Sequence, residues 1–457
     1  MISLNFTLVV ALQSHSQRSF SIKQKVLHET GTRTRERAVL VGVHLPGNTR
    51  YTSESSLEEL AQLADTAGAE VIEKILHARP KLDPAYFIGQ GKAELIAALV
   101  TEQDIDVVIF DDDLSPGQAT NLQEMFEKKV LDRSGLILDI FARRACTKEA
   151  RTQVELAQLE YLLPRLAGHW THFTRHAGGI GLRGPGETQL ETDRRFVRQR
   201  IAHLTRELDK IERQRIVRRL HREGVFKVAL VGYTNAGKST LLNVLTEAEV
   251  LVENRLFATL DPTVRAFRHL DNGLHKDAGQ ILLIDTVGFI RKLPHDLVAS
   301  FKSTLAEARE AELLLHVIDV THPDFEQQIK TVREVLNDLE LGEYPVLHVF
   351  NKVDALSAPG LITRLRNEYA PAVLISAERK MFLDELQSRI AEFATANVVE
   401  FEAELPLAEP AILARIHRMA NVLERRFEED RVILKLRARQ PAADQIRHFL
   451  NFQPTLA

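Results

Sequence analysis

Short apolar runs alternate with helix-like stretches along the second half of the chain. Apolar runs at residues 226–231, 281–284, 345–350 and 372–375 are each followed by a polar loop. Continuous apolar runs of this length are typical of buried parallel strands. Parallel strands that alternate with helices share one edge at their carboxyl ends, where ligands bind. Residues 224–396 therefore predict an open α/β domain with a mostly parallel sheet.

The same alternation recurs nearer the amino terminus. Apolar strands are expected at residues 38–43 and 106–110, with helical patterns near residues 56–68, 92–102 and 115–128. This pattern predicts a βα domain with a parallel sheet over residues 36–148. We expect residues 1–35 to form an irregular tail.

A pair of long helices is expected between these two domains. Leu156, Leu159 and Leu163 fall on one helical face, and a second apolar seam repeats at intervals of four and three residues through Val197, Ile201, Leu204, Leu208 and Ile211. Two such helices joined by one loop should pack as an antiparallel hairpin over residues 149–223. Its tip is expected at residues 170–189.

The last segment, residues 397–457, reads as a strand, a helix, two strands across a turn at 428–430, and a final helix. The predicted fold class is therefore a multidomain α/β protein. It combines the open α/β domain over residues 224–396 with the N-terminal βα domain, its helical hairpin and a small C-terminal α+β domain.

Composition adds two constraints. The chain has 457 residues, of which 44% are hydrophobic and 27% charged, as in ordinary soluble proteins. The net charge of −4 conceals an asymmetry, because residues 143–223 carry eighteen basic and ten acidic side chains, a local +8 that leaves −12 elsewhere. The single cysteine, Cys146, excludes an internal disulfide framework and suits a reducing cytosol.

No apolar run reaches the length of a membrane span, and the short apolar stretch at residues 6–12 lacks the flanks of a signal peptide. We expect a cytoplasmic monomer, with partial membrane association as an alternative location.

The loop after residues 226–231 carries the clearest chemistry. It reads Gly232, Tyr233, Thr234, Asn235, Ala236, Gly237, Lys238, Ser239 and Thr240, a G-x4-G-K-S pattern at the start of a helix. Glycines let successive N–H groups face a phosphate, and the helix adds its positive end. Lys238 is expected on the β- and γ-phosphates and Ser239 on Mg²⁺. A plain glycine turn before a helix is the alternative.

Three further loops complete a guanine-nucleotide site. The loops, each after an apolar run, are Asp285, Thr286, Val287 and Gly288; Asn351, Lys352, Val353 and Asp354; and Ser376, Ala377 and Glu378. Asp285 can hold Mg²⁺ through water, and the Gly288 N–H can meet the γ-phosphate. The Asp354 carboxylate accepts hydrogen bonds from guanine N1 and N2, whereas adenine presents an acceptor there. The ligand expected is therefore GTP or GDP, and residues 224–396 are the predicted G domain, meaning a GTP-binding domain with a phosphate loop.

The sequence identifies fewer of the residues that GTP hydrolysis requires than of those that bind the nucleotide. Small GTPases often carry a glutamine after the D-x-x-G glycine, but here that position is Phe289, so we expect slow intrinsic hydrolysis. The only plausible switch segment contains Phe257, Ala258, Thr259, Leu260 and Asp261. Thr259 is the expected second Mg²⁺ ligand, with Thr263 as the alternative. The expected catalytic residues are Lys238, Thr259, Asp285 and Gly288.

Two other features suggest ligands. Asn235 within G-x-x-N-x-G-K-S resembles potassium-dependent GTPases, in which this asparagine helps to hold K⁺. The hairpin tip is rich in glycine and adjoins an arginine run, so we expect RNA contacts at Arg175, Gly181, Arg183, Gly184, Arg194 and Arg195. Residues 89–92, Gly-Gln-Gly-Lys, could bind an anion but more often form a simple turn before a helix.

Two unrelated segments carry a family resemblance. Residues 178–195, Gly-Gly-Ile-Gly-Leu-Arg-Gly-Pro-Gly-Glu-Thr-Gln-Leu-Glu-Thr-Asp-Arg-Arg, and residues 285–295 closely resemble the HflX family of ribosome-associated GTPases. The resemblance runs from about residue 36 to 396. It implies a GTP hydrolase that binds the large ribosomal subunit and its rRNA and splits or rescues ribosomes. It also implies ATP at a second site in some members.

Two other functions remain open from the sequence. One is an ATP-dependent RNA-remodelling enzyme regulated by its G domain, although no second Lys-Ser/Thr phosphate loop is present. The other is a GTP-switched scaffold outside the ribosome, which would use the apolar seam of the hairpin to pair with a partner helix.

Overall fold

The computed structural model describes residues 35–47, 49–167, 185–219, 225–246, 256–257, 263–267, 281–292, 308–356, 359–396, 398–406, 412–413, 416, 419–428 and 431–451. The described residues fall into two compact units. The first takes residues from 1–207, 255–257 and 291–300, and the second takes those from 208–254, 258–290 and 301–457. The first unit thus includes two short segments that are distant in sequence from the N-terminal domain.

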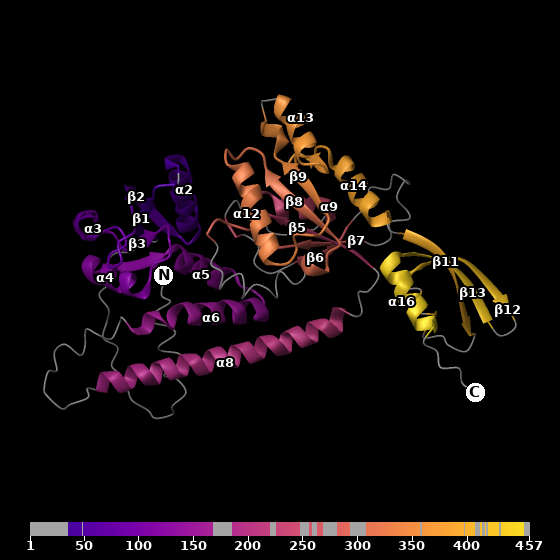
Figure 1. Cartoon of the computed structure of the whole chain (residues 1–457), viewed down its shortest axis with the longest axis horizontal. Coiled ribbons are helices and arrows are strands. Elements are labelled where there is room, and N and C mark those ends of the chain that lie inside the picture. Colours follow the sequence, from indigo (N-terminus) through magenta and orange to yellow (C-terminus); the bar gives the residue numbers. More distant parts are fainter. Residues whose placement is uncertain are drawn as a thin grey trace. The chain divides into compact units, whose positions relative to one another are not determined.

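The N-terminal domain is built on a four-stranded parallel sheet. Its strands are β1 Glu36–His44, β2 Ala69–Ala78, β3 Val107–Phe110 and β4 Lys129–Asp132, in the order β2-β1-β3-β4. Four helices accompany them, namely α2 Arg50–Thr66, α3 Gln90–Glu102, α4 Pro116–Phe126 and α5 Arg133–Arg144. Apolar side chains of α3 and α4 share a core with β1 and β3. The predicted parallel βα domain is confirmed (Figure 1).

Helix α5 and strand β2 were not among the predicted elements. Every residue of α5 from Arg133 to Phe141 is buried. A helix buried on all sides lacks the amphipathic period by which helices are identified in a sequence. Its start is fixed by Asp132, whose Oδ1 accepts a hydrogen bond of 2.8 Å from the Gly135 N–H. The consequence is a rigid helix in the middle of this unit.

The predicted helical hairpin consists of α6 Lys148–Leu162 and α8 Pro185–Arg219, with a short 3₁₀ turn at Arg165–Ala167. Two ion pairs join the helices, Arg200 to Glu155 at 2.7 Å and Lys148 to Glu207 at 2.6 Å. Because the later residue of α8 pairs with the earlier residue of α6, the two helices run antiparallel. The tip, with Arg175, Gly181, Arg183 and Gly184, lies outside the described residues.

The second unit contains a six-stranded sheet. Its strands are β5 Phe226–Gly232, β6 Thr263–Ala266, β7 Ile281–Asp285, β8 Leu313–Asp319, β9 Val346–Asn351 and β10 Ala372–Leu374. Their order is β10-β9-β8-β5-β7-β6, and β6 alone pairs antiparallel, with β7. This is the mostly parallel sheet that the apolar runs predict.

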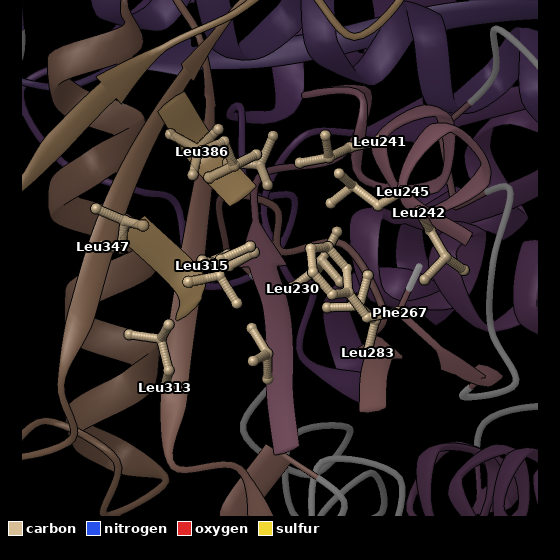
Figure 2. Packing of buried hydrophobic residues seen from close by; sticks show 14 of the residues in the cluster. Leu230, Leu241, Leu242, Leu245, Phe267, Leu283, Leu313, Leu315, Leu347 and Leu386 are labelled. Atoms are coloured by element: carbon tan, nitrogen blue, oxygen red, sulfur yellow. The ribbon is translucent and has the colours of Figure 1, made fainter. Parts of the chain in front are cut away.

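Helices cover both faces of that sheet. On one face, α9 Lys238–Thr246 and α14 Leu383–Thr395 contribute Leu241, Leu245 and Leu386 to the main core (Figure 2). On the other face, α12 Phe325–Asp338 and α13 Pro359–Glu368 pack through Ile329 and Leu365. With apolar cover on both faces, the strands are held so that their carboxyl ends present the loops of the site.

The C-terminal segment forms a small α+β domain, as predicted. Strands β11 Val398–Pro406, β12 Asn421–Glu428 and β13 Arg431–Arg439 form an antiparallel sheet in the order β11-β13-β12, followed by α16 Gln440–Asn451. Alternate residues of β13, including Leu434 and Leu436, are buried against Ile446 of α16. Among the described residues, every helix is too short or too polar to cross a membrane.

Candidate nucleotide-binding site

The phosphate loop between β5 and α9 is shaped by a close contact with β9. Gly237 has a φ of 95°, and a Cβ at this position would lie 2.3 Å from Nδ2 of Asn351. A side chain is therefore excluded twice, by the backbone conformation and by the asparagine amide. Only glycine lets the loop and the end of β9 approach this closely.

Asn351 uses that approach to join two loops. Its Nδ2 donates to the Ala236 carbonyl at 2.9 Å, and its Oδ1 accepts from the Ala377 N–H at 2.9 Å. The side chain is buried, so both hydrogen bonds are shielded from water. One amide thus fixes the phosphate loop relative to the loop that begins at Ser376.

Lys238, the first residue of α9, is buried and turned back over its own loop. Its Nζ donates to the carbonyls of Gly232 at 3.0 Å and Tyr233 at 2.8 Å. Burial lowers the pKa of Lys238 to about 8, and the nearby Asp285 carboxylate opposes this effect. The ammonium group therefore lies where an anion would stabilise its charge.

Ser239 and Asp285 bring two hard oxygen ligands together. The Ser239 hydroxyl donates to Oδ2 of Asp285 at 2.9 Å, and Asp285 is fully buried at the end of β7. Such a hydroxyl and carboxylate suit Mg²⁺, which takes few ligands from protein and the rest from phosphate and water. The described residues contain no cluster of three or more acidic, histidine or cysteine side chains that would hold a metal by itself.

Asp354, in the loop that follows β9, makes an interaction that the sequence did not predict. Asp354 has a lowered pKa because it accepts a hydrogen bond from the Ser376 hydroxyl and faces Arg379. Nε of Arg379 donates to Oδ2 of Asp354 at 3.0 Å. Nearby, Nζ of Lys352 donates to Oδ2 of Asp319 at 2.6 Å and to the Asn235 carbonyl at 3.1 Å. The carboxylate at 354 is therefore held in its ionised form by a hydroxyl and a guanidinium group.

Switch I is only partly within the described residues. Phe257 is buried, whereas Ala258, Thr259, Leu260 and Asp261 lie outside them. Thr263 begins β6 and is the antiparallel partner of Asp285. Phe289 is apolar and 2% exposed, so its side chain offers no polar group at the position after Gly288.

Two residues that contact the candidate site, Asp319 and Arg379, were not identified from the sequence. Asp319 ends the apolar strand β8, a signal that could have marked it, but Arg379 follows no pattern that would set it apart from a solvated arginine.

At residues 89–92, a side chain on Gly89 would collide with the Arg79 guanidinium, which also donates to the Ile88 carbonyl. Packing against Arg79 accounts for this glycine turn without a ligand.

Comparison with known proteins finds relatives that match most of the chain, including the four loops. Residues 54–142 match a model for the N-terminal domain of GTP-binding GTPases, residues 144–222 the middle region of such GTPases, and residues 227–352 a 50S ribosome-binding GTPase. GTPase HflX of Escherichia coli is 44% identical over 424 residues, with 92% of this chain and 97% of the relative covered. GTPase HflX of Magnetococcus marinus is 44% identical, covering 86% and 90%.

The chain belongs to the HflX family of GTPases. It binds GTP and GDP and hydrolyses GTP, as the four loops predicted. Among solved structures, a GTP-binding protein from Sulfolobus solfataricus in complex with GDP is 27% identical, covers 79% of this chain and 99% of its own, and aligns with a TM-score of 0.43. The family assignment rests on the sequence relatives.

The buried Lys238 predicts that nucleotide affinity falls in alkaline solution. Burial holds the pKa of Lys238 at about 8, and a neighbouring phosphate would raise it by favouring the charged form. Binding then takes up a proton above pH 8, and the Kd for GDP should increase by up to about tenfold per pH unit from there. Titration with fluorescent GDP between pH 7 and 9 measures this, with a melting curve at each pH as a control for folding. A constant Kd over the whole range would contradict it.

Asp354→Asn should change the base that is recognised. The asparagine amide offers one donor and one acceptor, which match the C2 carbonyl and N1–H of xanthine but leave guanine N2 facing an amide N–H₂. We expect GDP affinity to fall on the order of a hundredfold and XDP to become the better ligand. Competition binding of the two diphosphates measures this. Asp384→Asn, at an exposed acidic residue in the first turn of α14, should leave the preference for GDP unchanged.

Proposed function

We propose that this HflX family GTPase is a GTP-controlled factor that binds the large ribosomal subunit through its basic hairpin and separates or rescues ribosomes. The observation that carries the proposal is a guanine-nucleotide site in one chain with a long helix whose exposed face is rich in arginine. The match of residues 227–352 to a 50S ribosome-binding GTPase supports the choice of partner.

The proposed ligand roles follow the contacts in the site. Lys238 would exchange its two loop carbonyls for the β- and γ-phosphates, and backbone N–H groups of the phosphate loop would hold the same groups. Ser239 and Asp285 would hold Mg²⁺, with Thr259 as the switch I ligand. The metal, when bound, neutralises phosphate charge. Asp354 and the loop of residues 376–378 would bind guanine.

The proposed chemistry is the transfer of the γ-phosphoryl group to water. Lys238 would stabilise the charge that develops on the phosphate oxygens, and the Gly288 N–H would donate to the γ-phosphate. Phe289 has no group to orient the attacking water, so the intrinsic rate should be low. We propose that the ribosome completes or orders this part of the site, which would couple hydrolysis to binding.

The proposed RNA surface lies along the first described turns of α8. Arg195 and Arg198 are exposed there, and Phe196 keeps 46% of its area exposed, a large fraction for an apolar side chain. The Arg195 guanidinium lies 6.0 Å from the ring centre of Phe196. An arginine beside an exposed aromatic ring can contact phosphate and stack on an unpaired base. The predicted tip residues would extend this surface.

Ribosome binding is tested by GTP hydrolysis with and without purified large subunits. We expect a stimulation on the order of a hundredfold or more, because a partner that supplies the missing ordering can raise a slow GTPase by such factors. Reversing the charges of Arg194 and Arg195 to glutamate should remove most of the stimulation without changing GTP affinity. Reversing Arg213, exposed further along the same helix, is the matched control.

Deleting residues 180–186 tests whether the hairpin tip is needed for ribosome splitting but not for nucleotide binding. We expect unchanged GTP binding with loss of ribosome splitting, measured by the separation of subunits on sucrose gradients. No stimulation by large subunits in a protein that still binds GTP would overturn the proposed partner and favour the scaffold function. RNA unwinding that survives Lys238→Ala would instead favour the ATP-driven enzyme.

We propose in addition that K⁺ assists hydrolysis through Asn235. This residue has a φ of 61° and an exposed side chain at the mouth of the phosphate loop. Hydrolysis should be several-fold faster in KCl than in NaCl at equal ionic strength, and Asn235→Ala should remove the difference. Equal rates of the unaltered protein in the two salts would exclude this role.

A further inference from the structure

Arg379, which donates to Asp354, stands on a turn that is fastened at both ends. Ser376 and Met381 exchange two backbone hydrogen bonds of 3.2 and 3.0 Å, and the Arg379 N–H donates to the Ser376 hydroxyl oxygen at 3.1 Å. The backbone of Arg379 is therefore fixed beside the loop that carries Asp354, and both loops belong to the second unit. The guanidinium group is joined to that backbone by a long side chain with many rotamers.

The two partners of this ion pair differ in their exposure to water. The Asp354 side chain is 20% exposed, whereas that of Arg379 is 71% exposed. If the two separate, water can solvate the guanidinium group at once, but the carboxylate needs other donors. Ion pairs with one partner this exposed contribute little free energy. Another donor can therefore take the place of Arg379 on Asp354.

The hydrogen-bonding capacity of Asp354 is nearly used. Its carboxylate accepts from the Ser376 hydroxyl, from its own backbone N–H and from Arg379. An ionised carboxylate offers about four lone-pair positions. Guanine, placed as in the proposed function, would add the donors N1–H and N2–H₂, which exceeds that capacity. One donor must then leave. Ser376 is 1% exposed and bonded within its loop, so the replaceable donor is Arg379.

We propose that Arg379 is a specificity-determining residue, whose guanidinium group competes with the N2 amino group of guanine for the Asp354 carboxylate. The competition weakens the binding of guanine nucleotides and speeds their release. It also narrows the preference for guanine over hypoxanthine, which lacks the N2 amino group and can bind Asp354 while Arg379 stays in place. The inference rests on the proposed contact between Asp354 and guanine.

The test compares GDP with IDP, the diphosphate of hypoxanthine, in the full-length protein. Arg379→Ala should tighten GDP binding about two- to fivefold, the order expected when an exposed ion pair no longer has to be broken. The Kd of IDP should be nearly unchanged, so the ratio of the two Kd values should shift towards GDP by the same factor. Fluorescent GDP should dissociate more slowly in stopped-flow measurements. Arg379→Met, which keeps the apolar stem but not the charge, should act in the same way.

Arg389→Ala is the matched control, because Arg389 pairs with Glu392 on α14 in the same unit and is 51% exposed. It should leave the ratio unchanged, and general destabilisation would weaken both ligands together. In Asp354→Asn, measured with XDP, Arg379→Ala should have no further effect, since the amide carries no charge to hold the guanidinium group.

Weaker GDP binding in Arg379→Ala, as expected if the guanidinium group covered the base, would overturn the proposal. An unchanged ratio of the Kd values for IDP and GDP would do so as well. The contact on which the proposal rests is tested separately by Asp354→Asn alone. If that variant kept its full GDP affinity, the contact with guanine would be wrong, whereas a loss of affinity there with no shift in Arg379→Ala would refute only the competition.

Discussion

The nucleotide site depends on one amide, the side chain of Asn351. Its two hydrogen bonds hold the phosphate loop and the Ser376 loop at fixed positions, and both need a glycine at 237 to leave room. Lys238 and Ser239 follow directly on the phosphate loop and Asp354 follows β9, so these hydrogen bonds fix the loops that carry them relative to one another. If Asp354 binds guanine as proposed, the same amide sets the separation between the phosphate and the base.

Polar groups of the nucleotide site are paired with one another. Lys238 donates to carbonyls of its own loop, Ser239 to Asp285, and Arg379 to Asp354. These hydrogen bonds satisfy polar groups at partly or fully buried positions. A nucleotide that took up Lys238 and Asp354 would exchange these hydrogen bonds for others, so the net free energy of binding would be smaller than the sum of the new contacts.

The sequence predicted those parts of the structure that depend on neighbouring residues. The apolar strands at 226–231, 281–284, 345–350 and 372–375 and the antiparallel hairpin follow from local periodicity, and the structure confirms them, whereas β2, β4, β6 and β8 were not predicted. Helix α5 was missed because burial on every side removes its period. The ion pair of Lys292 with Asp111 was missed because the two residues lie 181 positions apart in the chain, and no local pattern marks either one as a partner. The roles assigned to Thr259 and to the hairpin tip stay predictions, since both lie outside the described residues.

Strand β6, which follows the predicted switch I segment in the chain, has four residues and forms one edge of the six-stranded sheet. A terminal strand is hydrogen-bonded to one neighbour, so displacing it breaks about half as many bonds as displacing a central strand would. The core between β5, β8 and β9 would not be disturbed by such a movement. If the proposed switch I segment moves with the bound nucleotide, the central strands that lead into the phosphate loop can therefore stay in place while it does so.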